Sequence, residues 1–378
     1  MGSFYCQLDY EHIPYRAPER TVDGNLANNG CGVCSLSMVL ENMMGIPFPP
    51  EKAAVLAKVC GSRETYGTNL YIAAPYFAAA FGMKVRDTED LEEAKRFLAE
   101  KRGMVIANVR GDREGYQGIF ADSGHYVVIA ALDGSTAKVW DPMFRLGSDR
   151  YDRPYRRDKV RTEGTDAYAD IEVFRQDCWH RPYFLFEKDE APVRPAAIGV
   201  LCGTESEAGP IVSEISQAGG KPIVLSPETL SKSLSLLDSL DGLFIADESG
   251  EAVSEAIRLC REREKPVIAM GKGFEAFADA FKLSLTRAAD TASVTPQYAT
   301  RLEALLAADE VMPVYGKAEL PEGMRMGAAD ADGNIAALEW KPGTLCMALT
   351  QKPERMDKKD LRALLTVLVM LAHRQRGE

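Results

Sequence analysis

The order of the expected helices and strands changes near residue 190, and this change constrains the fold more than any other feature of the chain. Before residue 190, stretches with a helical period come first and short β-like runs follow, which is typical of an α+β domain. After it, apolar runs of strand length alternate with amphipathic helices, which predicts a doubly wound α/β domain. The polar, proline-containing segment 188–195 separates the two patterns. We therefore expect domains at residues 1–188 and 196–378.

The apolar periods and the capping residues place the individual elements. In the first domain we expect helices at 31–44, 51–59, 70–81 and 91–101, strands at 104–109, 125–132, 137–140 and 183–186, and a loop at 26–30. In the second domain we expect strands at 197–201, 222–225, 242–246 and 266–270, and helices at 211–218, 252–264, 301–307 and 362–373.

The charge and the hydropathy of the chain exclude several kinds of partner. The formal net charge of −11 argues against nucleic acid and anionic membranes, because both are bound by basic surfaces. No apolar run reaches about eighteen residues, and the start of the sequence has no signal-peptide pattern. We therefore expect a cytoplasmic protein that binds neither nucleic acid nor a membrane.

The eight cysteines do not predict a disulfide framework, because they are spread over a long chain without a secretion signal. Cys31 and Cys34 form a C-x-x-C pair. A zinc site would need a second such pair, and a redox motif would need a preceding strand. The sequence has neither feature, so we expect no metal and no organic cofactor.

Cys31 is expected in the first turn of a helix. The positive end of a helix favours a thiolate over a thiol and lowers the pKa of the cysteine. The neighbours Gly30 and Gly32 have no side chains, so a substrate can approach the backbone closely. A cysteine in an apolar helix is more often a core residue, and a catalytic role therefore requires partners.

Two residues at strand ends are the expected partners. His125 begins one expected strand, and Asp141 directly follows the next. A tight turn at Asp133-Gly134 would make these strands antiparallel and bring Asp141 to His125. The carboxylate would then hold one ring nitrogen while the other nitrogen faces the thiolate. Cys31, His125 and Asp141 therefore predict a Cys-His-Asp triad.

Residues 20–187 resemble the papain-like cysteine peptidases of family 39, which process double-glycine leaders of bacteriocins. The matching motifs are Cys31-Gly32-Val33-Cys34-Ser35-Leu36, Gly124-His125-Tyr126-Val127-Val128 and Asp141-Pro142, in this order. The resemblance implies a papain-like fold in which Cys31 forms a thioester acyl-enzyme, His125 is the base and Asp141 orients it. Val33 departs from the proline of the family. Asn25 stands where the family has its oxyanion-hole glutamine, so we expect Asn25, or Asn28 or Asn29 in its place, to act with the Cys31 amide.

Residues 196–378 resemble the class I glutamine amidotransferases, closest to the γ-glutamyl hydrolase type of family 26. The similar stretches are 240–245, 265–273, 331–339 and 352–354. The resemblance implies a flavodoxin-like sheet, but it puts Gly271 at the nucleophile elbow and Lys352 at the histidine position. Asp247 and Glu248 replace the glycine-rich oxyanion loop, and only Glu354 of the Cys-His-Glu set remains. We therefore expect an inactive domain that serves as a scaffold, joins two copies of the chain or binds a ligand.

These features predict a cysteine peptidase or amidohydrolase that acts on a peptide or an amide-bearing small molecule. One alternative is an acyltransferase that passes the acyl group to an amine, since butirosin-type acyltransferases resemble this fold. A second alternative is a non-catalytic binding or scaffold protein. The basic segment 144–182 also has two interpretations, a solvated excursion from the surface or a flap that holds an anionic substrate.

Overall fold

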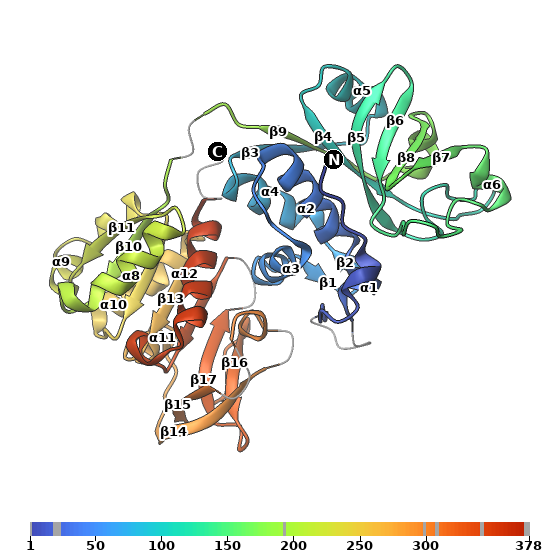
Figure 1. Ribbon diagram of the computed structural model, residues 1–378. Coiled ribbons are helices and arrows are strands. Elements are labelled where there is room, and N and C mark those ends of the chain that lie inside the picture. The colour runs from blue at the N-terminus through green and yellow to red at the C-terminus, as the bar shows by residue number, and fades with distance from the viewer. Residues whose placement is uncertain are drawn as a thin grey trace. The chain divides into compact units, whose positions relative to one another are not determined.

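The computed structural model describes residues 2–17, 24–191, 194–297, 300–306, 310–340 and 344–373. The chain divides into two compact units, which we describe separately (Figure 1). The first unit contains residues 1–57 and 62–192, and the second contains 58–61 and 193–378. Within the described ranges, no helix is both long and apolar enough to cross a membrane.

The first unit begins with its helices. They are η1 Gln7–Tyr10, α1 Leu26–Asn29, α2 Cys31–Met44, α3 Pro50–Val59, α4 Leu70–Ala80 and α5 Leu91–Ala99. The four expected helices are confirmed to within two residues at each end. The loop expected at 26–30 is wrong, because Leu26–Asn29 form a helical turn. Asn25 caps this turn, and its side chain accepts a hydrogen bond from the amide of Asn28.

The strands of this unit form an antiparallel sheet in the order β3-β9-β4-β5-β6-β8-β7. They are β3 Met83–Thr88, β4 Gly103–Val109, β5 His125–Asp133, β6 Thr136–Trp140, β7 Val160–Glu163, β8 Asp166–Asp170 and β9 Tyr183–Lys188. The remaining elements are the hairpin β1 Arg63–Glu64 and β2 Gly67–Thr68 and the short helices α6 Pro154–Arg157 and α7 Val173–Asp177. The expected turn between β5 and β6 is confirmed, with Asp133 opposite Thr136 and Gly134 at φ +58°.

The core of the first unit lies against one face of this sheet. Val105 and Ala107 of β4 and Val127 and Ile129 of β5 point to this face, and all four are fully buried. The residues between them point to the opposite face of the sheet. Aromatic side chains from outside the strands cover them, among them Phe97, Phe120 and Phe174. Burying one large apolar side chain contributes about 1.5–3 kcal/mol, so this cluster fixes the strands that carry the site.

The second unit contains the rest of the elements. They are β10 Ala197–Leu201, α8 Glu205–Gln217, β11 Lys221–Leu225, α9 Pro227–Lys232, η2 Leu234–Ser239, β12 Gly242–Ala246, α10 Glu251–Glu262, β13 Val267–Met270, α11 Gly273–Ala280, β14 Arg287–Pro296, η3 Leu302–Ala304, β15 Glu310–Tyr315, β16 Met324–Asp330, β17 Ile335–Trp340, β18 Cys346–Leu349, η4 Pro353–Arg355 and α12 Lys358–Ala372. The four expected strands are confirmed.

The second sheet has a parallel and an antiparallel part. β11, β10, β12, β13 and β18 lie side by side and run parallel. In chain order this arrangement is 2-1-3-4-5, the order of flavodoxin-like doubly wound sheets. The antiparallel strands β14–β17 follow beyond β18, and β17 pairs with both β15 and β16, so these four strands close on themselves.

Two expectations for the second unit are wrong. The helix expected at 301–307 is only the short turn η3 within the described residues, and residue 307 lies outside them. The helix expected at 211–218 begins six residues earlier, as α8 Glu205–Gln217.

Candidate active site

Cys31 begins α2, as the sequence predicts, and Gly30 is the residue before it. A side chain at Gly30 would place its Cβ 2.3 Å from the carbonyl oxygen of Leu26, so the tight passage from α1 into α2 requires glycine. The first amides of α2 have no carbonyl partner within the helix, and they point toward the thiol end of the helix. Cys31 is partly exposed, whereas the other seven cysteines are buried. It is therefore the cysteine best placed to meet a substrate.

His125 lies at the first position of β5 and is 6% exposed. Its Nε2 atom is 2.7 Å from Oδ1 of Asp141, which directly follows β6. The His125 side chain also makes a hydrogen bond with the Cys31 side chain. The three residues predicted from sequence are thus in contact in the order Cys31, His125, Asp141.

The carboxylate of Asp141 is fully buried and accepts four hydrogen bonds. Oδ1 is bonded to His125 and to the amide of Met143 at 2.8 Å. Oδ2 accepts from Nε of Arg150 at 2.5 Å and from the hydroxyl of Tyr151 at 2.6 Å. A buried carboxylate is costly unless its oxygens are satisfied in this way, and these bonds also fix the plane of the carboxylate.

The electrostatics of the three groups favour an ion pair. Loss of hydration around the sulfur would raise the pKa of Cys31. Hydrogen bonding to His125 and the charge of its ring outweigh this effect, so the pKa of Cys31 is lowered. Burial would lower the pKa of His125, but the Asp141 carboxylate and Cys31 outweigh it, and the pKa rises to about 9. Burial likewise opposes the charge of Asp141, yet Arg150 and His125 hold its pKa well below the usual range. The arrangement favours a thiolate beside an imidazolium.

Asn25, the expected oxyanion donor, lies at the start of α1. Its Oδ1 accepts a hydrogen bond from the Asn28 amide at 3.0 Å, which leaves the amide end of the side chain as the group that can donate. Gln7 supports this region, because its Nε2 donates to the Ala27 carbonyl and its backbone amide donates to the Pro142 carbonyl, both at 2.7 Å. The turn before Cys31 is thereby tied to the residue after Asp141.

The sequence patterns did not identify Arg150 and Tyr151 as residues of the site. Segment 144–182 was expected to be a solvated excursion or a flap for an anionic substrate, and neither interpretation accounts for the arginines of this segment that face inward. Arg150 binds Asp141 and the Phe120 carbonyl. Arg156 is 1% exposed and pairs with Asp122. These arginines support the site from within instead of facing solvent or a substrate. The only local signal was that an arginine and a tyrosine follow closely after Asp141.

The strand-to-helix elbow of the second unit has a glycine and an ion pair where a nucleophile would be expected. Gly271 lies between β13 and α11 with φ +61°, so the predicted strand-to-helix turn is present. A Cβ at this position would lie 2.3 Å from Oδ1 of Asp247. Asp247 also accepts a hydrogen bond from the Lys272 amide at 3.0 Å, and its Oδ2 is 2.5 Å from Nζ of Lys352. An ion pair therefore fills the space beside the elbow.

No group of three or more histidine, cysteine or acidic side chains within the described ranges has the geometry of a metal site. Cys34, the second cysteine of the C-x-x-C pair, is buried, and burial raises its pKa well above that of an ordinary thiol. Both cysteines of the pair are free thiols. Cys31 and Cys34 are thus in opposite electrostatic environments.

Solved structures similar to part of the chain include enzymes that act on glutamine. A glutamine amidotransferase of Thermotoga maritima is 11% identical, with 49% of this chain and all of that chain covered and a TM-score of 0.36. The glutaminase domain of Trypanosoma brucei CTPS is 11% identical, with 49% and 95% covered and a TM-score of 0.34. PurLQS of Thermotoga maritima is 13% identical, with 46% and 98% covered and a TM-score of 0.34. All three TM-scores are below 0.5, whereas the strand order of the second unit is itself the flavodoxin-like order 2-1-3-4-5.

No curated protein matches the chain by sequence. Residues 6–170, less than half of the chain, match the sequence model of the Peptidase_C39 like family. This range contains Cys31, His125 and Asp141. The first half of the chain therefore resembles the cysteine peptidases of that family.

Proposed function

We propose that the first unit is a papain-like thiol hydrolase, a cysteine peptidase or amidohydrolase in which Cys31, His125 and Asp141 form the catalytic triad. The observation that carries the proposal is the pairing of His125 with two groups at once. A fully buried carboxylate holds Nε2 at 2.7 Å, and the thiol at the start of α2 bonds to the same side chain. The match of residues 6–170 to the Peptidase_C39 like family supports the same chemistry.

The reaction follows from this arrangement. The Cys31 thiolate attacks the carbonyl carbon of an amide, and the imidazolium of His125 gives its proton to the leaving nitrogen as the C–N bond breaks. The product is a thioester on Cys31 and a free amine. Water then attacks the thioester, with neutral His125 as base, and the thiolate returns with release of the acid. Asp141 holds the ring in place and stabilises its charge in both steps.

We propose that the oxyanion of each tetrahedral intermediate is held by the Cys31 amide and the side-chain amide of Asn25. The orientation of Asn25 supports this role, since the helix cap uses only its oxygen. Asparagine has the same donor as the glutamine of the family with a shorter reach. The Asn25→Asp variant, which keeps the cap and loses the donor, should lower turnover by about 10²-fold.

For the second unit we propose a pseudoenzyme of the class I amidotransferase type that binds or packs without hydrolysis. The Asp247–Lys352 pair beside Gly271 supports this proposal, because it occupies the place that an elbow thiol would need.

Mass spectrometry after incubation with peptide pools tests the proposed function. We expect an acyl adduct on Cys31 in the wild type, and none in the Cys31→Ala variant. Adding amine acceptors separates hydrolysis from acyl transfer, because the thioester is shared and only the product differs. Absence of any adduct, together with a Cys31 no more reactive toward iodoacetamide than the buried cysteines, would favour a non-catalytic binding protein.

A further inference from the structure

The strand ends beside His125 bring three arginines and a tryptophan to the same edge of the first sheet. Val109, the last residue of β4, is paired with His125, and Arg110 is the next residue. The amide of Arg110 donates to the carbonyl of Asp177 at 2.7 Å, which joins the segment after β4 to the segment before β9. Arg181 lies in that second segment, two residues before β9. The arginines therefore follow directly from the strands that hold the site.

Trp179 makes cation–π contacts with two of these guanidinium groups. The carbon Cζ of Arg110 is 5.1 Å from the centre of the Trp179 ring, and Cζ of Arg113 is 5.0 Å from it. Cation–π contacts at such distances orient a guanidinium without neutralising it. Trp179 is 44% exposed, so the face of this cluster is open to a ligand.

The three arginines have no acidic partner. Among the residues that the structure describes, no carboxylate oxygen lies within 4.0 Å of Arg110, Arg113 or Arg181, although most arginines of this unit form such pairs. Arg113 donates from Nη2 to Oε1 of Gln176 at 2.6 Å, whereas its Nη1 atom is buried and makes no hydrogen bond. The nearby carboxylate of Asp177 is already bonded to the Tyr116 hydroxyl and to the amides of residues 119 and 120.

An aromatic wall connects this cluster to Cys31. The amide of Tyr126 bonds to the Cys31 sulfur, the Tyr126 ring is 6.5 Å from Phe184, and Phe184 is 5.2 Å from the exposed ring of Tyr71. Burial raises the pKa of both tyrosines, and the charge of Arg181 opposes that rise in each. Arg181 precedes Phe184 of this wall by three residues, and the carbonyl of the intervening Pro182 accepts a hydrogen bond from the Asn108 amide of β4 at 3.1 Å.

We propose that Arg110, Arg113, Arg181 and Trp179 form a subsite for an anionic group, a carboxylate or a phosphate, on the substrate that Cys31 attacks. The inference rests on the proposed function and names a class of substrate for it. Guanidinium groups bind such oxygens through two parallel hydrogen bonds. Arginines that form no ion pair among the described residues, on a chain of net charge −11, also direct anions to this edge of the sheet.

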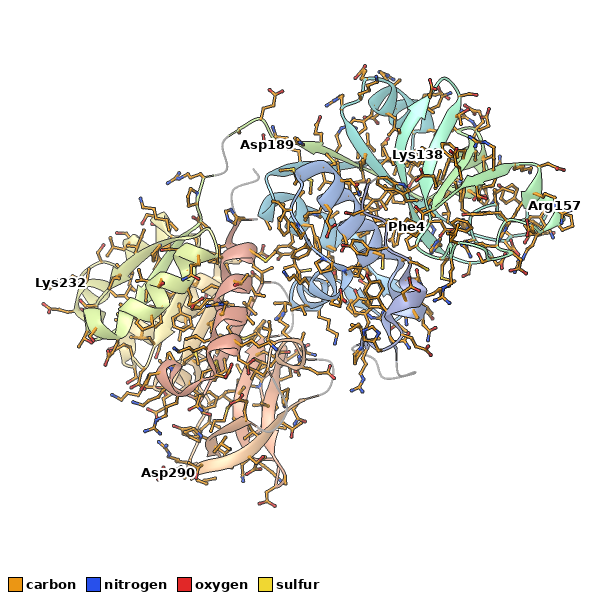
Figure 2. The ribbon with its side chains drawn as sticks, viewed as in Figure 1. Phe4, Lys138, Arg157, Asp189, Lys232 and Asp290 are labelled. Carbon is orange, nitrogen blue, oxygen red and sulfur yellow. The ribbon has the colours of Figure 1, made fainter. Side chains whose placement is uncertain are left out.

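The test compares two alkylating agents on the full-length protein. Iodoacetate is anionic and iodoacetamide is neutral, and each forms a thioether on Cys31 with loss of iodide. The Arg110→Gln and Arg181→Gln variants should lower the rate with iodoacetate by about threefold each, the effect of one exposed ion pair, and leave the rate with iodoacetamide unchanged. Arg157→Gln is the matched control, because Arg157 is also exposed and lies at the outer edge of this unit (Figure 2). Within the described ranges its guanidinium bonds only to the Asp152 carbonyl.

Competitors at constant ionic strength identify the anion. If succinate slows labelling of the wild type by iodoacetate, the subsite holds a carboxylate, and if inorganic phosphate does so, it holds a phosphate. An unchanged ratio of the two labelling rates in both variants, or an equal change in Arg157→Gln, overturns the subsite. A Cys31 that reacts slowly with iodoacetamide as well would instead contradict the proposed function, so the two failures can be told apart.

Discussion

The two units differ in the burial and the partners of the carboxylate that lies near a turn that could hold a nucleophile. In the first unit, the turn into α2 carries a partly exposed thiol, and the neighbouring Asp141 is fully buried with four hydrogen bonds. In the second unit, the turn after β13 carries Gly271, and the neighbouring Asp247 pairs with Lys352. The side chains of that pair are 23% and 38% exposed.

This difference in burial distinguishes the surroundings of Asp141 from those of Asp247. A carboxylate without exposure is costly to keep charged, so a network that holds it in one orientation next to a histidine indicates a role beyond packing. A partly exposed ion pair is screened by water and stabilises a protein by less than about 1 kcal/mol. If the contrast in burial reflects a contrast in function, substitutions in the first unit should affect turnover far more than substitutions in the second.

The largest effect should come from the thiol itself. Replacing Cys31 with alanine should lower turnover at least about 10³-fold, because the nucleophile is lost. The matched control is Cys202→Ala, a buried thiol of the second unit, which should keep activity within about twofold. Steady-state kinetics on any substrate found by the adduct screen measures both. Equal losses in the two variants would remove the contrast between the units.

The next effect concerns the carboxylate. Asp141→Asn should lower kcat by two orders of magnitude or more, because the ring loses its orienting partner and its imidazolium loses support. It should also lower the free energy of unfolding by about 3 kcal/mol, since Arg150 is left without its buried partner. Activity within about twofold of the wild type would exclude Asp141 from the triad.

Arg150→Gln tests the residue behind the carboxylate. We expect kcat to fall about tenfold with little change in KM, because Arg150 positions Asp141 and does not contact substrate. The Arg157→Gln variant again serves as the control for lost surface charge. A change in KM alone would contradict the positioning role.

A smaller effect is expected from pH, which should change the stability and the reaction rate gradually as His125 loses its proton. The pKa of His125 is about 9 in the folded protein, above its ordinary 6.5, so its protonated form is favoured by folding. The resulting stability is fully present below about pH 6.5 and is lost as the pH rises through about 9. We expect the imidazolium-dependent rate to fall with an upper limb near pH 9, and His125→Ala to abolish that limb. A limb unchanged in the variant would assign it to another group.

Sequence periodicity predicted many of the buried elements, but it missed the buried strands β17 and β18 and the exposed strands β3 and β14. The helices α2–α5 and the strands β10, β12 and β13 bury apolar residues along their length, and their sequences show it. The edge strand β3 has only one buried residue in six, and β14 has one in ten. Strands of this kind form because a neighbour offers free hydrogen-bonding groups, and that information is not in their own residues.

The candidate site shows the same division. Cys31, His125 and Asp141 were found because each begins or follows a regular element within a recognisable motif. Arg150 and Tyr151 lie in an irregular segment, and only the three-dimensional fold brings them to Asp141. Local patterns reveal the reacting groups, whereas the groups that orient them come from anywhere in the fold.

The smallest expected effect is in the second unit, in the full-length Cys31→Ala background that silences the first site. Gly271→Cys should produce no glutaminase activity, because the base is replaced by Lys352 and Asp247 occupies the adjacent space. It should lower the free energy of unfolding by about 2 kcal/mol, since an added Cβ would clash with Asp247 and a side chain is strained at φ +61°.

The Gly219→Cys variant separates the clash from the backbone strain. Gly219 has φ +85° and no atom within 4 Å of the added Cβ, so this variant has the backbone strain alone. We expect about 1 kcal/mol for that control by denaturant unfolding. Ammonia release from glutamine by Gly271→Cys would show that the elbow still holds a working base and oxyanion site, and the contrast between the two units would then reduce to one missing thiol.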